Sequence, residues 1–250
     1  MASTNQLKEK LARGTTVLGC IQLLPSADVT ELLALAGLDY IFIDHEHGIN
    51  GLGGLPDLLR AAKAGGAEAL VRMPSLDPHY VRRLLDAGLE TIYCPMIEAA
   101  DDAAAFVRVC RYPPHGERGA GGGTRASFLG LGPDHADRLD DRLMIIVAIE
   151  TVRGVQNLTQ IAAVPGIDAI FIGARDLSAS MGKLGRFDDP DLIATIAQCE
   201  AIIKASGKYL GAPVYPGLSV AEMIGRGYSM LLTGTDSGFL TAAAKASIAR

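Results

Sequence analysis

Tryptophan is absent from this sequence of 250 residues, and aromatic residues make up only 5% of it. Proteins that stack nucleic-acid bases rely on aromatic side chains, and proteins that bind polyanions carry clustered positive charge. Here the formal net charge is −5 and the isoelectric point is near 5.5. The composition therefore favours neither a nucleic-acid partner nor an anionic membrane surface.

Long apolar stretches are also absent. No run of 18 consecutive apolar residues occurs, and residues 1–13 are polar and charged, without the apolar centre of a signal peptide. The four cysteines do not form CxxC or any other metal-ligand spacing. We therefore expect buried free thiols in a protein of the reducing cytoplasm, with no membrane partner.

Apolar residues, at 49%, far outnumber charged residues, at 20%, so the chain can bury a sizeable core. Short apolar runs alternate with amphipathic segments that begin at capping residues and end at glycines. We predict strands over 16–21, 40–43, 69–72, 91–94, 143–149, 169–172, 209–214 and 230–233. We predict helices over 5–13, 26–36, 56–64, 78–87, 99–110, 134–142, 154–163, 190–206 and 220–226, and from 239 to the C-terminus.

Apolar strands that alternate with helices are typical of a parallel sheet that is buried on both faces. Eight such units in 250 residues predict one (β/α)₈ TIM-barrel domain over residues 1–250, preceded by a short N-terminal helix. The alternative is an open doubly wound sheet, which would normally carry a glycine-rich turn after its first strand. Leu23, Leu24 and Pro25 stand there instead. Residues 112–133 are rich in Gly, Pro and Arg, which predicts a long functional or interface loop.

The C-terminal ends of barrel strands form the active face. Polar and special residues gather at these predicted ends: Gln22, Asp44, Glu46, His47, Arg72, Pro95, Met96, Glu150, Arg175, Asp176, Tyr215, Thr235 and Asp236. The opposite ends carry Asp39, Glu68, Glu90 and Asp168, which we predict to be solvated turn residues.

Glu150 and Asp176 follow consecutive strands and should lie side by side. Two carboxylates with room for waters and substrate oxygens make a site for a hard cation such as Mg²⁺ or Mn²⁺. The spacing is equally consistent with a structural role in which one or both carboxylates cap the following helix.

Two histidines follow the second strand. His47 beside such a cation is a candidate general base, and a surface histidine or a satisfied loop residue is the alternative. His45 shares the side of His47 only if strand geometry continues past Asp44. Asp86, at the end of a helix, could orient an imidazole, although a carboxylate facing water is the more common situation.

Arg72 at the tip of the third strand can hold a carboxylate or polarise a carbonyl oxygen. A structural ion pair with Asp44 or Glu46 is the competing interpretation. None of the seven lysines ends a predicted strand, and only Lys183 lies in an active-face loop. A Schiff-base mechanism needs a lysine in the site, so carbonyl chemistry here would rely on a metal.

Taken together, these segments resemble the HpcH/HpaI aldolase family, the metal-dependent class II pyruvate aldolases that include 2-dehydro-3-deoxyglucarate and 4-hydroxy-2-oxo-heptanedioate aldolases. The resemblance spans nearly the whole chain. It is carried by DYIFIDHEH at 39–47, VRMP at 71–74, LLDAG at 84–88, PM at 95–96, RG at 118–119, IET at 149–151 and FIGARDLS at 171–178.

The resemblance implies a (β/α)₈ barrel that assembles as a homo-hexamer, a dimer of trimers. The enzyme would reversibly cleave a 4-hydroxy-2-oxo acid to pyruvate and an aldehyde through a metal-stabilised pyruvate enolate. Glu150 and Asp176 would bind the divalent metal, Mg²⁺, Mn²⁺ or Co²⁺. Arg72 would steady the keto or enolate oxygen, and His47, paired with Asp86, would be the acid and base.

The same resemblance gives other residues supporting places. Asp44 and Glu46 would order water or the edge of a neighbouring subunit, and the loop at Arg118 and Gly119 would lie near a subunit interface. Substrate binding would involve Arg72 together with the segment Gly173, Ala174 and Arg175.

Three positions depart from the family pattern. His45 replaces a small residue, Ala148 replaces a glutamine, and the pair Ala174 and Arg175 stands where a proline usually begins the segment. These departures leave the metal ligands and the base intact and concern the aldehyde acceptor. There are three alternatives to the aldolase. The first is a lyase that acts on a CoA thioester, as citrate lyase β-type relatives do. The others are an enolate-forming decarboxylase and a non-catalytic metal-binding barrel.

Overall fold

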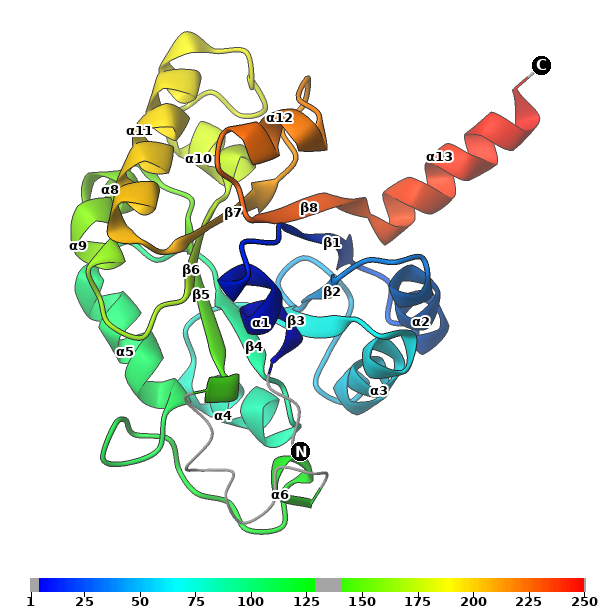
Figure 1. Cartoon of the computed structure of the whole chain (residues 1–250), viewed down its shortest axis with the longest axis vertical. Helices are drawn as coiled ribbons and strands as arrows, with labels where there is room; N and C mark the ends of the chain where they lie inside the picture. The colour runs from blue at the N-terminus through cyan, green and yellow to red at the C-terminus, as the bar shows by residue number, and fades with distance from the viewer. Residues whose placement is uncertain (1–4, 129–140, 250) are drawn as a thin grey trace.

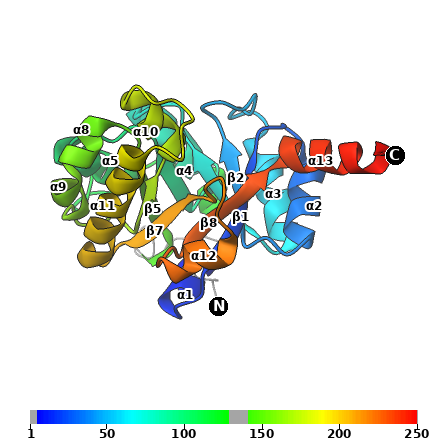
Figure 2. The same cartoon turned by 90° about the horizontal axis from the view of Figure 1, so that it is seen from above.

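The computed structural model describes residues 5–128 and 141–249. Its eight parallel strands form a closed barrel in which each strand pairs with its sequence neighbour and β8 pairs with β1. The strands are β1 (Val17–Gln22), β2 (Tyr40–Asp44), β3 (Glu68–Arg72), β4 (Thr91–Cys94), β5 (Met144–Ile149), β6 (Ala169–Ile172), β7 (Tyr209–Pro213) and β8 (Met230–Thr235). Helices surround them (Figures 1 and 2), which confirms the predicted (β/α)₈ barrel.

The helices mostly begin where the sequence supplies a capping residue. Asp77 and Asp189 each cap a helix with their carboxylates, and each is followed by a proline in the first turn. The helices are α1 (Gln6–Ala12), α2 (Ala27–Leu35), α3 (Leu55–Gly65), α4 (Pro78–Asp86), α5 (Ala100–Cys110), α6 (Arg125–Phe128), α8 (Val152–Gln156), α9 (Leu158–Ala162), α10 (Ala174–Ser180), α11 (Pro190–Ser206), α12 (Val220–Gly225) and α13 (Asp236–Ile248).

Several helix predictions need correction. The predicted helix over 154–163 is two short helices, α8 and α9, which meet at Asn157, whose side chain donates to the Glu98 carbonyl at 2.8 Å. Helix α10 was not predicted, and the predicted irregular loop contains the short helix α6. Helix α13 begins at Asp236, three residues before the prediction, because Thr235 caps it. The helix predicted over 134–142 lies almost entirely outside the described residues.

Strand residues alternate between two apolar layers. One layer, between the strands and the helices, contains Ile41, Ile43 and Val71. The other fills the barrel and contains Tyr40, Phe42, Leu70, Tyr93, Met144, Ile146, Ala148, Phe171, Met230 and Leu232, together with Leu7 and Leu11 of α1. Helix α1 therefore closes the N-terminal end of the barrel.

Aromatic rings form a layer higher in the barrel. The ring centroids of Phe42 and Tyr93 are 5.0 Å apart, and those of Tyr93 and Phe171 are 5.4 Å apart, both pairs in edge-to-face contact. A Cβ at Gly211 would lie 2.1 Å from the Phe171 ring, so only glycine fits beside that ring. This layer separates the core from the open, C-terminal end of the barrel.

The prediction of solvated carboxylates at the N-terminal strand ends was wrong. Asp39 and Asp168 form ion pairs with Lys10 and Lys8 of α1 and accept hydrogen bonds from main-chain N–H groups of strands. Glu90 pairs with Arg142. Burial and the nearby charge of Glu90 raise the pKa of Glu68 to about 7. These carboxylates attach α1 and the following segments to the barrel, a role that depends on tertiary contacts.

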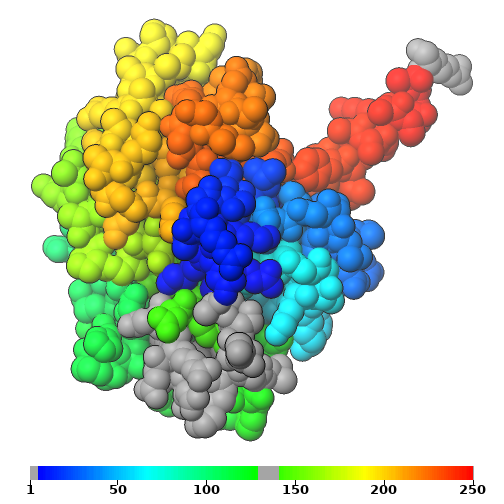
Figure 3. Space-filling model, viewed as in Figure 1, coloured from blue at the N-terminus to red at the C-terminus, as the bar shows by residue number. Residues whose placement is uncertain are grey.

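Helix α13 extends away from the barrel, as Figure 1 shows and the space-filling view in Figure 3 makes plain. Asp236 is the one buried residue of α13, and its carboxylate accepts hydrogen bonds from the N–H groups of Leu23 and Leu24 at the start of the β1–α2 connection.

The four cysteines are buried and free, as predicted. None of the helices in the described part of the chain is long and apolar enough to cross a membrane.

Candidate active site

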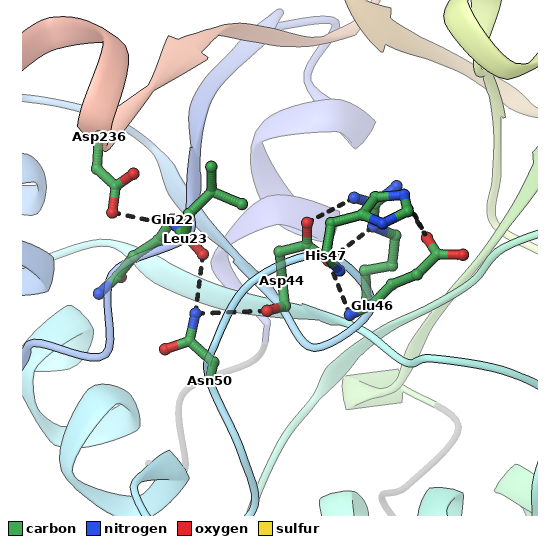
Figure 4. Close-up of polar contacts among 8 residues, drawn as sticks. Gln22, Leu23, Asp44, Glu46, His47, Asn50 and Asp236 are labelled. Carbon is green, nitrogen blue, oxygen red and sulfur yellow. Dashed lines mark hydrogen bonds and ion pairs between the residues drawn. The ribbon is translucent and has the colours of Figure 1, made fainter. Parts of the chain in front are cut away.

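Strand β2 brings Asp44 to the open end of the barrel. Its side chain is fully buried, and its Oδ1 accepts hydrogen bonds from the N–H groups of Glu46 and His47, at 2.9 and 3.2 Å. Asn50 donates to the carbonyl groups of Gln22 and Asp44 from the other side (Figure 4). Asp44 therefore fixes the path of the chain immediately after the strand.

Arg72 lies opposite Asp44 in the register of β2 and β3. Its Nε and Nη2 donate to the two oxygens of Asp44 at 2.9 and 2.6 Å, and its Nη1 lies 3.0 Å from Glu46 Oε2. Burial alone would raise the pKa of Asp44, but these hydrogen bonds hold it below its ordinary value. The structural ion pair, which was the competing interpretation of Arg72, is present, and Arg72 also borders the pocket described below.

The two histidines after β2 lie in different places. His47 borders the pocket, its side chain is 61% exposed, and its Nε2 lies 3.7 Å from Glu46 Oε2. His45 is 7% exposed, and its Nδ1 lies 2.8 Å from the hydroxyl of Tyr80 on α4. Burial lowers the pKa of His45 to about 4, so this imidazole is neutral at pH 7. His45 does not border the pocket, whereas His47 does.

Glu150, directly after β5, is 3% exposed. Its Oε2 accepts the N–H of Met96 at 2.9 Å, and Met96 has the positive φ of 57°. A Cβ at Gly173 would lie 2.6 Å from Glu150 Oε1, so glycine leaves the space that this carboxylate occupies. Burial raises the pKa of Glu150 to about 7; the Met96 N–H opposes the rise, and the charge of Asp176 adds to it.

Asp176, in the first turn of α10, borders the same pocket as Glu150. The described residues contain no group of three or more His, Cys, Asp or Glu side chains arranged to hold a metal. Mg²⁺, however, commonly takes only one or two carboxylates and completes its shell with waters and substrate oxygens. Two neighbouring carboxylates, one buried and resisting ionisation, fit a hard divalent cation, which would compensate their charge.

A cavity of about 410 Å³ lies at the open end of the barrel. It brings together four of the predicted side chains, those of His47, Arg72, Glu150 and Asp176, and the segment from Gly173 to Arg175. The remaining lining residues are Ile21, Phe42, Tyr93, Phe171, Pro213 and Leu232. These apolar and aromatic positions did not feature in the sequence prediction, although their inward orientation follows from strand alternation.

Asp86 does not border this cavity. Its Oδ1 accepts a hydrogen bond at 2.8 Å from Arg118, which is only 2% exposed and stacks over the ring of Tyr112 at 4.6 Å. No contact joins Asp86 to His47 within one chain among the described residues, so their pairing stays a prediction. The loop at Arg118 is therefore attached to α4 by an ion pair in which the arginine is buried and the carboxylate is partly exposed.

Comparison with known proteins agrees with this arrangement. Residues 19–243 match the family described as HpcH/HpaI aldolase/citrate lyase. A hydroxypyruvate/pyruvate aldolase from Roseovarius nubinhibens is 35% identical over 250 residues, which covers 100% of this chain and 97% of the relative. A 5-keto-4-deoxy-D-glucarate aldolase from Salmonella arizonae is 36% identical over 238 residues, covering 95% and 93%.

A solved structure agrees as well. An HpcH/HpaI aldolase/citrate lyase family protein from Burkholderia cenocepacia J2315 superimposes with a TM-score of 0.93 at 35% identity, covering 98% of each chain. The family match, the relatives that span the whole length and the barrel with its site all agree. The chain therefore belongs to the HpcH/HpaI aldolase/citrate lyase family and is an enzyme of the aldehyde-lyase type.

Proposed function

We propose that this enzyme is a divalent-metal-dependent, class II pyruvate aldolase that reversibly cleaves a 4-hydroxy-2-oxo acid to pyruvate and an aldehyde. One observation carries the proposal: a single pocket combines two neighbouring carboxylates, an anchored arginine and an accessible histidine. None of the lining residues in the described part of the chain is a lysine, which is consistent with chemistry that needs no Schiff base. The aldolase names of the two relatives support the same activity.

Glu150 and Asp176 would hold the metal, Mg²⁺, Mn²⁺ or Co²⁺. A divalent cation held there would supply Lewis acidity for the carbonyl chemistry of pyruvate. The Met96 N–H orients the Glu150 carboxylate, and the absence of a side chain at Gly173 leaves room for it.

Arg72 would bind the keto oxygen and stabilise the negative charge that develops there during cleavage. Asp44 holds the guanidinium with two hydrogen bonds, so Arg72 is already oriented before substrate arrives. A fixed donor needs no reorganisation when the charge forms, which is the condition for effective transition-state stabilisation.

His47 would transfer the proton. In cleavage it takes the proton of the 4-hydroxyl group, the C3–C4 bond breaks, C4 becomes the aldehyde carbonyl carbon, and the bonding electrons pass to pyruvate as its enolate. A proton then returns to C3 to give the methyl group of pyruvate. An exposed imidazole can take part in this step and exchange its proton with water.

The proposal is tested by exchange of the methyl protons of pyruvate with solvent deuterium, followed by NMR with Mg²⁺, Mn²⁺ or Co²⁺ present. We expect exchange by the wild type, and a loss of roughly 10²–10⁴-fold in His47→Ala, as for removal of a general base. Binding of Mn²⁺, measured by electron paramagnetic resonance, should persist in that variant. His79→Ala, which changes an exposed histidine on α4, is the matched control.

Undiminished exchange in His47→Ala would contradict the assigned base. Undiminished Mn²⁺ binding by Glu150→Ala would contradict the assigned ligand. A wild type that cleaves CoA thioesters but releases no pyruvate from hydroxy-oxo acids would replace the aldolase proposal with the CoA-thioester lyase. The homo-hexamer and the cytoplasmic location stay predictions, and sedimentation velocity tests the first of them.

A further inference from the structure

The hydroxyl group of Tyr93 is a hydrogen-bonding group of the cavity that the proposed mechanism does not use. Tyr93 borders the cavity, although the residue as a whole is only 3% exposed. Its hydroxyl forms no hydrogen bond with any residue in the described part of the chain. The unpartnered hydroxyl of Tyr40 is completely enclosed, whereas that of Tyr93 is not. The Tyr93 hydroxyl therefore opens into the cavity.

The ring that carries this hydroxyl is fixed inside the barrel. Its centroid lies 5.0 Å from that of Phe42 and 5.4 Å from that of Phe171, and both contacts are edge to face. In the register of β3 and β4, Tyr93 is the direct partner of Arg72, which borders the same cavity. The hydroxyl is thus held in place before any substrate enters.

Charged groups surround the Tyr93 hydroxyl. The charges that act on it belong to four residues at the open end of the barrel: Glu150, Arg72, Glu46 and Asp176. Burial and the charge of Glu150 raise the pKa of Tyr93 well above its ordinary value. A tyrosine is protonated at pH 7 even without such a rise. Tyr93 is therefore a neutral hydrogen-bond donor near the proposed metal ligands and Arg72.

A fixed donor contributes most where negative charge develops, because it needs no reorganisation when that charge forms. In the proposed reaction this place is the keto oxygen of pyruvate, which becomes the enolate oxygen. Arg72 would bind the same oxygen, but each of its three nitrogens also contacts Asp44 or Glu46. Its positive charge is thus shared with two acids, and a second donor beside it would add to the stabilisation of the enolate.

We propose that Tyr93 is a further catalytic residue, whose hydroxyl donates a hydrogen bond to the keto oxygen of pyruvate beside Arg72. This inference rests on the proposed aldolase function. The hydroxyl keeps its proton throughout, and the hydrogen bond becomes stronger as negative charge develops on the oxygen. Tyr93 therefore favours enolate formation more than it favours the binding of pyruvate.

The test is Tyr93→Phe, which removes the hydroxyl and keeps the ring between Phe42 and Phe171. In the exchange of the methyl protons of pyruvate we expect kcat to fall roughly 10²-fold, as for removal of one oxyanion donor while another remains. KM for pyruvate should change little. Oxalate is planar and carries negative charge in place of the enolate oxygen. In calorimetry it should bind roughly tenfold more weakly, as for loss of a charge-assisted hydrogen bond.

Tyr40→Phe is the matched control. Tyr40 is also buried inside the barrel, but its hydroxyl is enclosed and Tyr40 does not border the cavity. We expect wild-type kcat and wild-type oxalate binding in Tyr40→Phe. Both variants should keep the circular dichroism spectrum and the Mn²⁺ affinity of the wild type. An unchanged kcat in Tyr93→Phe, or an equal fall in Tyr40→Phe, would overturn the inference.

The failure of this inference can be distinguished from the failure of the aldolase function. A wild type that shows no exchange would contradict the aldolase function itself. A wild type and a Tyr93→Phe variant that exchange at the same rate would contradict only the role of Tyr93. If Tyr93→Phe bound Mn²⁺ more weakly, the hydroxyl would act through the metal ligands, and the inference would be wrong. A raised KM for pyruvate with unchanged kcat would also contradict it, because the hydrogen bond would then not strengthen as the enolate forms.

Discussion

Replacing Asp44 with asparagine should destabilise the enzyme strongly while leaving the size and shape of the side chain unchanged. The Asp44 side chain is fully buried, and it holds Arg72 by two hydrogen bonds at 2.9 and 2.6 Å. Removal of one partner from a buried ion pair typically costs about 3–5 kcal/mol, because it leaves the other charge uncompensated. Arg72 keeps its contact with Glu46 at 3.0 Å, so we expect a loss near the lower end, about 3 kcal/mol.

For a chain of this size, 1 kcal/mol corresponds to a shift in Tm of roughly 2–4 °C, so Asp44→Asn should lower Tm by roughly 6–12 °C. The measurement is thermal unfolding at pH 7 by circular dichroism, with urea unfolding as a second estimate. Asp57→Asn provides the control, because the ion pair of Asp57 with Arg60 is largely exposed, at 65% and 57%. An exposed pair of this kind contributes about 0–1 kcal/mol.

A Tm for Asp44→Asn that equals that of Asp57→Asn would refute this reasoning. It would show that the Arg72 charge finds sufficient compensation in Glu46 and solvent. If Asp44→Asn had a lower Tm but full exchange activity at low temperature, Asp44 would be needed for stability and not for orienting Arg72 during catalysis.

Two further predictions concern other parts of the molecule. Gly173→Ala would place a Cβ 2.6 Å from Glu150 Oε1, so we expect weaker Mn²⁺ binding at an unchanged fold, measured by calorimetry and circular dichroism; wild-type affinity would contradict the assigned ligand geometry. In the folded enzyme the pKa of Glu68 is raised from 4.5 to about 7. Between these two pH values the folded state therefore binds more protons than the unfolded state. The free energy of unfolding should fall as the pH rises through this range, by up to about 3 kcal/mol. Urea unfolding at pH 5 and pH 8 should show this fall in the wild type and a smaller one in Glu68→Gln; equal falls would contradict the raised pKa.

The barrel could be predicted from sequence because its signals are local. Each strand is a short apolar run, and helices such as α4 and α11 begin at an aspartate followed by proline. Helix α10 was missed because its N-cap residue, Gly173, has no side chain to cap it, and the helix follows its strand without a turn signal. The start of α13 was placed three residues too late because the local cap at Thr235 was overlooked, whereas the contacts of the Asp236 carboxylate with the β1–α2 connection are tertiary and leave no local signal.

In the candidate site, too, some residues could be placed from the sequence and others could not. Placing polar residues at strand ends was enough to bring His47, Arg72, Glu150 and Asp176 into one pocket, because all parallel strands of a barrel end on the same face. The partner of Asp86 could not be predicted in this way. Arg118 lies 32 residues later in an irregular segment, and the path of such a segment depends on contacts that no local pattern records.

The four residues that follow Ile43 show how adjacent side chains take separate roles. Asp44 points inward and holds Arg72, whereas His45 contacts Tyr80 on α4 and is excluded from the pocket. Glu46 adds a second contact to Arg72, and His47 reaches the cavity. Asp44 and Glu46 together hold Arg72 in place, and Arg72 still borders the cavity. The buried residues Asp44 and His45 thereby make structural contacts, and the exposed His47 keeps the place that we propose for proton transfer.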